Sequence, residues 1–330
     1  MNSFVFTRAP DVASALDAVH GNRAAKFLGG GTNLVDLMKE GVEAPEQLVD
    51  INRLPLGGIE EKEGGLRIGA LARNSDVAAH ALVRERYPLL AQALLSGASP
   101  QLRNLATVGG NLMQRTRCYY FCDADMPCNK RKPGSGCGAL GGFNRIHAIL
   151  GASDSCVAVH PSDMCVALAA LDATVEVQGP KGTRKVPMVD FHRLPGDAPE
   201  RDTQLAADEL ITAVMLPPSA AAAHSHYLKV RDRASYAFAL VSVAVALEMD
   251  GGKISKARIA LGGVAHKPWR IEGAEMLLVN GSTDESVFAS AAEALLAGAR
   301  PLRYNHFKVD LAHRAIVRAL STAVAGIEAK

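Results

Sequence analysis

Six cysteines crowd into one narrow stretch of this 330-residue sequence, and they are the side chains best suited to do chemistry. They are Cys118, Cys122, Cys128, Cys137, Cys156 and Cys165. A disulfide framework usually stabilises a small secreted domain, and this chain is neither small nor marked by an apolar signal segment. Clustered cysteines in a reducing compartment more often bind a metal. Cys165 is different because it lies in the apolar run 164–171, where a buried free cysteine is expected.

The cysteine-rich stretch is also the part of the sequence with the least regular periodicity. From residue 114 to about 144 it is rich in cysteine, glycine, proline and basic side chains. A segment this long without regular structure needs something to order it, and bonds from four thiolates to one metal centre would do so. Four thiolates suit tetrahedral zinc or an iron–sulfur cluster. Among the cysteines, only Cys118 and Cys122 have a spacing close to that of zinc sites. The cysteine spacing typical of ferredoxins is absent. Free structural thiols therefore stay an alternative.

Two glycine-rich turns are candidates for binding phosphate. Gly29-Gly30-Gly31-Thr32-Asn33 follows an apolar stretch and precedes an expected helix, and Gly109-Gly110-Asn111 forms the second turn. Glycines let backbone N–H groups approach an anion closely, and a helix N-terminus adds a favourable dipole. Neither turn fits the Rossmann or Walker pattern, so each alone is consistent with a plain tight turn. The pair favours a diphosphate held from two sides.

The elements that must position these residues are mixed helices and strands. A compact β-α-β-like unit is expected within the first fifty residues, and alternating residues predict strands at 66–71, 174–177 and 210–216. The Asn74-Ser75-Asp76 sequence predicts the start of a helix that runs to about residue 85. In the C-terminal part of the chain, from about residue 227, strands are expected first and helices after them. This order is typical of an α+β domain. The tail strands are expected at 227–230, 238–247 and 257–262, and its helices at 272–279, 285–296 and 306–324.

Composition narrows the class of protein. Basic and acidic residues number 36 and 34, for a net charge of +2, and 48% of residues are hydrophobic. This balance argues against a nucleic-acid-binding surface, which needs concentrated basic side chains. The sequence has no run of about 20 apolar residues, so no membrane protein is expected, and the default location is cytoplasmic. The ten histidines are scattered and are expected mostly at the surface or as helix caps.

Four stretches, taken together and in order, resemble a known family. They are FLGGGTNLVDLMKEG, LRNLATVGGNLMQ, HPSDMCVALAALDA and YLKVRDRASYAFALVSVAVAL. These stretches resemble the FAD-binding medium subunit of the xanthine dehydrogenase family of molybdenum hydroxylases over nearly the whole chain. The cysteine insertion is similar to that of the medium subunits of periplasmic aldehyde oxidoreductases, which bind an extra [4Fe-4S] cluster there.

The resemblance implies an α+β fold in two domains. A two-part FAD-binding domain of the vanillyl-alcohol-oxidase (PCMH) type would span 1–218, with lobes at 1–55 and 56–218. The [4Fe-4S] insertion would occupy about 114–157 of the second lobe. A smaller α+β C-terminal domain of the CO dehydrogenase flavoprotein type would follow at 222–330.

The resemblance also assigns residues to both cofactors. Asp163 would meet polar groups on the flavin side, Ile211 would pack near the isoalloxazine, and Lys229 would hydrogen-bond the flavin. The other FAD-binding residues, around the diphosphate, would be Lys26, Phe27, Leu28, Gly29, Gly30, Gly31, Thr32, Asn33, Thr107, Gly110 and Asn111. The cluster ligands would be Cys118, Cys128, Cys137 and Cys156. Cys122 would be a neighbour, although an exchange of roles between Cys122 and Cys156 stays open.

The implied function is electron transfer within a heterotrimeric aldehyde oxidoreductase. Electrons would pass from [2Fe-2S] clusters of a small partner through FAD to an external acceptor, while a molybdenum cofactor in a large partner would oxidise the substrate. Such a subunit can reach the periplasm by co-export on a partner's signal. Two alternatives are a stand-alone flavin reductase of the same fold and a zinc-stapled interaction protein.

Overall fold

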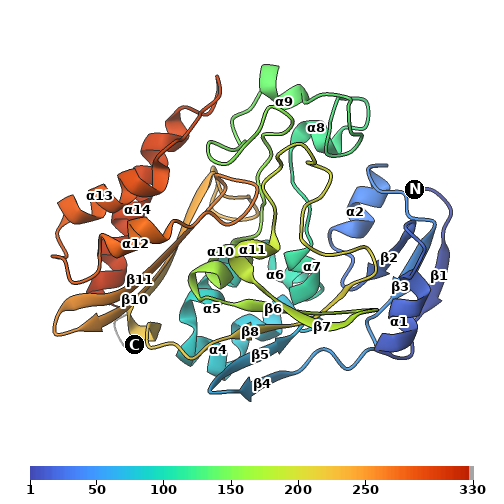
Figure 1. Cartoon of the computed structure of the whole chain (residues 1–330), viewed down its shortest axis with the longest axis horizontal. Helices are drawn as coiled ribbons and strands as arrows, with labels where there is room; N and C mark the ends of the chain where they lie inside the picture. The colour runs from blue at the N-terminus through green and yellow to red at the C-terminus, as the bar shows by residue number, and fades with distance from the viewer. Residues whose placement is uncertain (327–330) are drawn as a thin grey trace.

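The computed structural model describes residues 1–326, so residues 327–330 of the predicted C-terminal domain lie outside the described residues. The described chain is built around three β-sheets. Figure 1 shows the N-terminal lobe (blue) and the C-terminal domain (orange and red) on opposite sides of the molecule, with the five-stranded sheet between them. The cysteine-rich loop, which carries α8 (Tyr119–Cys122) and α9 (Gly138–Gly141), extends from one edge.

The N-terminal lobe is the expected β-α-β unit, arranged as a parallel sheet in the order β1-β3-β2. Asp11 begins the first helix because its side chain accepts a hydrogen bond from the Ser14 backbone N–H at 2.8 Å. The helix packs its apolar face, which includes Leu16 and Val19, against Val49 of the sheet. The elements of this lobe are β1 (Val5–Arg8), α1 (Val12–Val19), β2 (Ala25–Leu28), α2 (Leu34–Lys39) and β3 (Gln47–Asp50).

The second sheet is antiparallel, with the strand order β4-β5-β8-β6-β7. Every residue of its central strand β8 is buried. The single helix expected at 74–85 is instead two helices, because His80 has an extended backbone between them. The strands are β4 (Ile59–Lys62), β5 (Gly65–Gly69), β6 (Thr174–Gly179), β7 (Gly182–Pro187) and β8 (Leu210–Leu216); the helices are α3 (Asn74–Ala79), α4 (Ala81–Arg86), α5 (Pro88–Ser96), α6 (Pro100–Arg103), α7 (Val108–Leu112), α10 (Asp163–Ala170) and α11 (Met188–Phe191).

The C-terminal sheet is antiparallel, in the order β11-β10-β9, and it is covered on both faces. Along β10, Val243 and Val245 belong to the core formed with α13 and α14, whereas Ala244 and Ala246 belong to the core that contains α10. Burial on both faces explains why this strand reads as a continuous apolar run. The elements are η1 (Ala222–His224), β9 (Ser225–Val230), β10 (Val241–Asp250), β11 (Lys253–Gly262), α12 (Glu272–Met276), α13 (Glu285–Leu296) and α14 (Phe307–Ala325).

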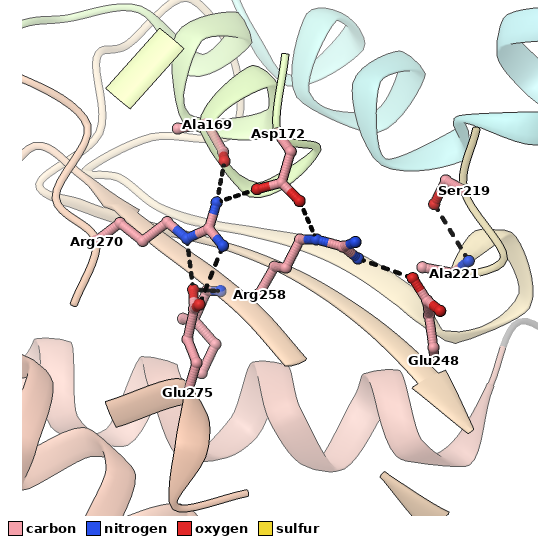
Figure 2. A network of polar contacts seen from close by, with 9 residues as sticks. Ala169, Asp172, Ser219, Ala221, Glu248, Arg258, Arg270 and Glu275 are labelled. Carbon is pink, nitrogen blue, oxygen red and sulfur yellow. Dashed lines mark hydrogen bonds and ion pairs between the residues drawn. The ribbon is translucent and has the colours of Figure 1, made fainter. Parts of the chain in front are cut away.

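A network of charged side chains joins the C-terminal sheet to the end of α10 (Figure 2). Asp172 receives hydrogen bonds from Arg258 and, at 2.5 Å, from Arg270. Arg270 also pairs with Glu275 at 2.7 Å, and Arg258 with Glu248 at 3.1 Å. Burial alone would raise the pKa of Asp172, but the two arginines hold it below its usual value. The network therefore links the C-terminal domain to the end of α10. No helix of the described part is long and apolar enough to cross a membrane.

Candidate cofactor sites

The first glycine turn connects β2 to α2, and its glycines are required by the backbone. Gly31 has a positive φ of 72°, which favours glycine. A Cβ added at Gly30 would lie 2.1 Å from the Leu105 carbonyl oxygen, so only glycine allows the two turns to pack together. Close packing between the turns therefore explains Gly30 without reference to any ligand.

The same turn presents hydrogen-bond donors that the protein does not use. Among residues 1–326, no protein acceptor is bonded to the backbone N–H groups of Gly30, Gly31, Thr32 and Asn33. The Asn33 side chain accepts a hydrogen bond from the Arg115 backbone N–H at 3.0 Å, while its buried Nδ2 has no partner in the described chain. Buried donors without partners are costly, and a phosphate would satisfy them. The turn thus fits the diphosphate of FAD.

The second turn is organised by Thr107 and Asn111. Thr107 caps α7, because its Oγ1 accepts a hydrogen bond from the Gly110 N–H at 3.1 Å. Asn111 Oδ1 accepts a hydrogen bond from the Ser162 hydroxyl at 2.7 Å. Ser162 in turn caps α10 by accepting a hydrogen bond from the Cys165 N–H at 3.0 Å. The turn and the start of α10 are therefore held together as one wall.

Two cavities meet at these turns, and every predicted FAD-binding residue lines at least one of them. The larger cavity, of about 700 Å³, lies between the second turn, α10 and the C-terminal domain. The smaller one, of about 470 Å³, lies between the first turn and the segment that leads into β8. Thr32, Asn33 and Gly110 line both. The larger cavity alone is lined by Asn111, Asp163 and Lys229. The smaller cavity alone is lined by residues 26–31, Thr107 and Ile211.

The larger cavity contains a buried ion pair. Lys229 Nζ lies 2.8 Å from Asp163 Oδ2 and also donates to the Ser96 carbonyl at 3.0 Å. The Tyr227 hydroxyl donates to Asp163 Oδ1 at 2.7 Å. Burial, followed by the Asp163 charge, raises the pKa of Tyr227 well above its usual value, so the phenol stays protonated and donates. Two of the three Lys229 donors are thus engaged by the protein, which leaves one for a ligand.

Ile211 does not share a cavity with Asp163 and Lys229. It lies on β8 and lines the smaller cavity. The two residues that the resemblance assigns to the flavin ring, Ile211 and Lys229, are thus in different cavities. Their roles at the ring stay predictions.

The thiols of the cysteine-rich loop gather in one apolar cluster. Cys118, Cys128 and Cys156 are buried there, Cys122 and Cys137 are half-buried, and all are free. Burial raises the pKa of Cys118 to about 12 and that of Cys156 to about 11, and neighbouring thiols add to both rises. An uncoordinated thiol would therefore stay protonated, and thiolate formation needs a metal. Cys165 is buried in α10 and free, as expected.

Thiols gathered in this way suit either a single zinc ion or an iron–sulfur cluster. In tetrahedral zinc sites with Zn–S bonds of about 2.3 Å, ligand sulfurs lie about 3.8 Å apart. Within residues 1–326, the set of three potential metal ligands that closes to within 4.8 Å is His160, Cys165 and His192, and no loop thiol belongs to such a set. An iron–sulfur cluster binds each thiolate to a different iron. Zinc and an iron–sulfur cluster therefore both stay candidates for these thiols.

Cys122 differs from the four predicted ligands. It lies at the end of α8, where burial raises its pKa while the charge of Arg117 lowers it. Neighbouring thiols add to the rise in pKa of both competing cysteines: Cys128 for Cys122, and Cys137 and Cys128 for Cys156. The choice of Cys156 rather than Cys122 as the fourth ligand therefore stays a prediction.

Charged side chains attach the loop to the rest of the FAD-binding domain. Lys130, whose side chain is 3% exposed, lies 2.5 Å from Asp202. Arg115 bonds the same carboxylate at 2.7 Å and Glu43 at 2.6 Å. Arg117 pairs with Asp36 of α2 at 2.6 Å. The loop is thus tied to the helix that follows the first glycine turn, so the two candidate sites share a scaffold.

Two buried histidines lie against the thiols. His147 Nε2 is 3.0 Å from Cys118 Sγ, and His266 Nε2 is 3.3 Å from Cys156 Sγ. Burial lowers the pKa of His147 to about 4 and that of His266 to about 3. His192 is also buried, so these three are exceptions to the expectation that most histidines lie at the surface or cap helices.

Comparison with known proteins decides the family. Residues 2–219 match the family described as the FAD binding domain in molybdopterin dehydrogenase, and residues 204–323 match the CO dehydrogenase flavoprotein C-terminal domain. The chain belongs to this FAD-binding family. It is therefore the medium, FAD-binding subunit of a molybdenum hydroxylase, an oxidoreductase, and the expected family and fold class are confirmed.

Individual relatives in this family cover almost the whole chain. The aldehyde oxidoreductase FAD-binding subunit PaoB of Escherichia coli K12 is 52% identical over 325 residues, which is 98% of this chain and 99% of the relative. The glyceraldehyde dehydrogenase medium chain of Sulfolobus acidocaldarius is 28% identical, over 90% of this chain and 89% of its own. A carbon monoxide dehydrogenase structure from Hydrogenophaga pseudoflava is 28% identical, with a TM-score of 0.78 and 98% of both chains covered.

Proposed function

We propose that this FAD-binding subunit serves an aldehyde oxidoreductase and carries a [4Fe-4S] cluster of its own. The aldehyde substrate is supported by the 52% identity to the E. coli relative, whose name states that activity. The observation that carries the cluster is the gathering of free, mostly buried thiols in one loop. The expected partners are a large molybdenum-cofactor subunit and a small [2Fe-2S] subunit, with an external electron acceptor.

In this proposal FAD spans both cavities, with its diphosphate at the glycine turns. The isoalloxazine occupies the larger cavity beside Lys229, where one ammonium donor is free for a flavin acceptor. The adenosine occupies the smaller cavity, which Ile211 also lines, and the packing of Ile211 near the isoalloxazine stays a prediction. FAD supplies the ability to accept electrons and release them singly or in pairs, while the protein orients it and limits its exposure to water.

The proposed cluster ligands are Cys118, Cys128, Cys137 and Cys156. An isolated antiparallel β-bridge pairs Cys128 with Cys137, so the backbone holds these two residues opposite each other. The Asn129 side chain links this pair to the segment of Cys156, because its Nδ2 donates to the Ser155 carbonyl at 3.0 Å. The loop backbone is therefore already shaped to bring the ligands together.

Serine substitutions test the ligand set. We expect Cys128→Ser to lose most of the iron, whereas Cys122→Ser keeps it, and Cys165→Ser is a matched control for loss of a buried thiol. Iron and acid-labile sulfide per chain measure the outcome. Full iron in the Cys128→Ser protein would show that the ligand set is wrong.

A reduction experiment tests the substrate class. Adding an aldehyde to the anaerobic complex should bleach the flavin absorbance, because electrons reach the FAD of this subunit from the partner subunits. Flavin that stays oxidised with aldehydes, but is reduced directly by a nicotinamide dinucleotide, would instead support a stand-alone flavin reductase.

A further inference from the structure

Two imidazoles hold defined positions against the proposed cluster ligands. His147 contacts the Cys118 sulfur and His266 contacts the Cys156 sulfur, at 3.0 and 3.3 Å. The two residues are 1% and 7% exposed, so water does not compete for these contacts. Each histidine serves a different sulfur, and neither is part of the predicted ligand set.

The chemistry of sulfur fixes which ring nitrogen carries the hydrogen. A thiolate bound to iron offers only lone pairs, so the Nε2 atom that faces it must donate an N–H, whether the ring is neutral or charged. The Nδ1 atoms of both rings are buried and have no partner among residues 1–326. If a neutral ring carried its only hydrogen on Nδ1, that N–H would be a buried donor without a partner. The Nε2 lone pair would then face the sulfur lone pairs, so two acceptors would oppose each other. This arrangement is therefore the costlier one.

We propose that His147 and His266 are positioning residues that set the reduction potential of the [4Fe-4S] cluster by donating hydrogen bonds to two of its ligand sulfurs. This inference rests on the cluster put forward under Proposed function. A hydrogen bond to a ligand sulfur stabilises the more negative, reduced cluster more than the oxidised one, so it raises the potential. Two such bonds to different ligands act in the same direction.

The C-terminal domain keeps the first imidazole in place. Lys308 of α14, which is fully buried, donates from Nζ to the His147 carbonyl at 2.8 Å. Asn305 donates to the same carbonyl at 3.1 Å. His266 itself belongs to the segment after β11, where the Ala265 carbonyl accepts a hydrogen bond from the His160 N–H at 3.0 Å. The second domain therefore supplies His266 as one donor, and it holds in place His147, which belongs to the cysteine-rich insertion.

Substitutions separate potential tuning from simple packing. We would compare His147→Leu, His266→Leu, the double variant and His147→Gln. The control is His192→Leu, which removes a buried histidine that lies near Cys165 and not against a predicted cluster ligand. EPR-monitored redox titration of the anaerobic full-length subunit, alone or in its complex, gives the midpoint potential. We expect a more negative midpoint in each leucine variant, a larger shift in the double variant and a smaller shift in His147→Gln. The His192→Leu midpoint should match the wild type.

Two controls keep the outcomes distinct. If the wild-type protein contained no iron and gave no iron–sulfur EPR signal, the proposed cluster itself would be refuted. If both leucine variants kept full iron and had unchanged midpoint potentials, only the proposed role of the histidines would be refuted. Should a leucine variant lose iron, wild-type protein labelled with ¹⁵N-histidine decides. Its spin-echo modulation should contain coupling from histidine nitrogens, and a spectrum without that coupling overturns the proposal.

Discussion

The buried pair of Asp163 and Lys229 gives the sharpest test of the larger cavity. Their side chains are 7% and 4% exposed, and the Asp163 carboxylate also accepts the hydroxyl of Tyr227. Asp163→Asn keeps an acceptor oxygen but leaves the buried Lys229 ammonium without a counter-charge. Breaking a buried pair in this way costs about 3 kcal/mol or more. In a domain of this size that cost corresponds to a fall of about 6 °C in melting temperature.

The assay is thermal unfolding of flavin-free protein, at one scan rate, so that cofactor binding does not contribute to the result. The double variant Asp163→Asn/Lys229→Met should recover most of the loss, because no unpaired charge remains. Asp250→Asn, at an exposed strand end, is the matched control and should melt like the wild type. An Asp163→Asn protein that melts within about 1 °C of the wild type, or a double variant in which the losses add, would refute the reasoning.

Three further predictions use other parts of the fold. Gly30→Ala should strongly lower the amount of bound flavin, since the added Cβ would lie 2.1 Å from the Leu105 carbonyl oxygen. Gly57→Ala is the control: its added Cβ meets nothing within 4 Å, so this variant should bind flavin normally. Equal flavin content in the two variants would count against the close packing of the turns. Burial lowers the pKa of His192 to about 4, so the buried ring is neutral and favours the folded state fully above pH 6.5. As the pH falls toward 4, the unfolded chain takes up the proton first, and the free energy of unfolding should fall, by about 2 kcal/mol at pH 5. His192→Leu should flatten that decline in melting temperature, and an unchanged slope would contradict the buried neutral state. Arg258→Met should cost about 2 kcal/mol and speed proteolysis of the linker after β8, and unchanged cleavage would mean that the charged network does not hold the domains.

Much of the fold follows from periodicity, and the exceptions have physical causes. The helix expected at 285–296 has those bounds, because its apolar spacing is regular. The strands at 59–62 and 182–187 were not expected, because they lie at the two edges of their sheet and their side chains are mostly polar and exposed. The break at His80 was missed because the flanking residues have good helical spacing on both sides.

The candidate sites were predictable where their residues are close in sequence. The glycine turns and the crowded cysteines stand out by local spacing, whereas the choice of four ligands rests on the family resemblance. His147 is 29 residues from its thiol and His266 is 110 residues from its own, so nothing local marks either of them. The same holds for Lys130 and Asp202, which are 72 residues apart. A basic residue within a cysteine-rich loop is the one sequence signal that could have pointed to such a buried partner.

The most direct test of the account is the cofactor content of the wild-type subunit, purified without oxygen and separated from its partners. Absorbance together with flavin, iron, sulfide and zinc analysis should give about one FAD and about four irons per chain, with flavin bands above broad iron–sulfur absorption. A correctly folded, colourless protein that contains zinc and no flavin would contradict both halves of the proposal. Flavin without iron would leave the family function standing and would remove the cluster.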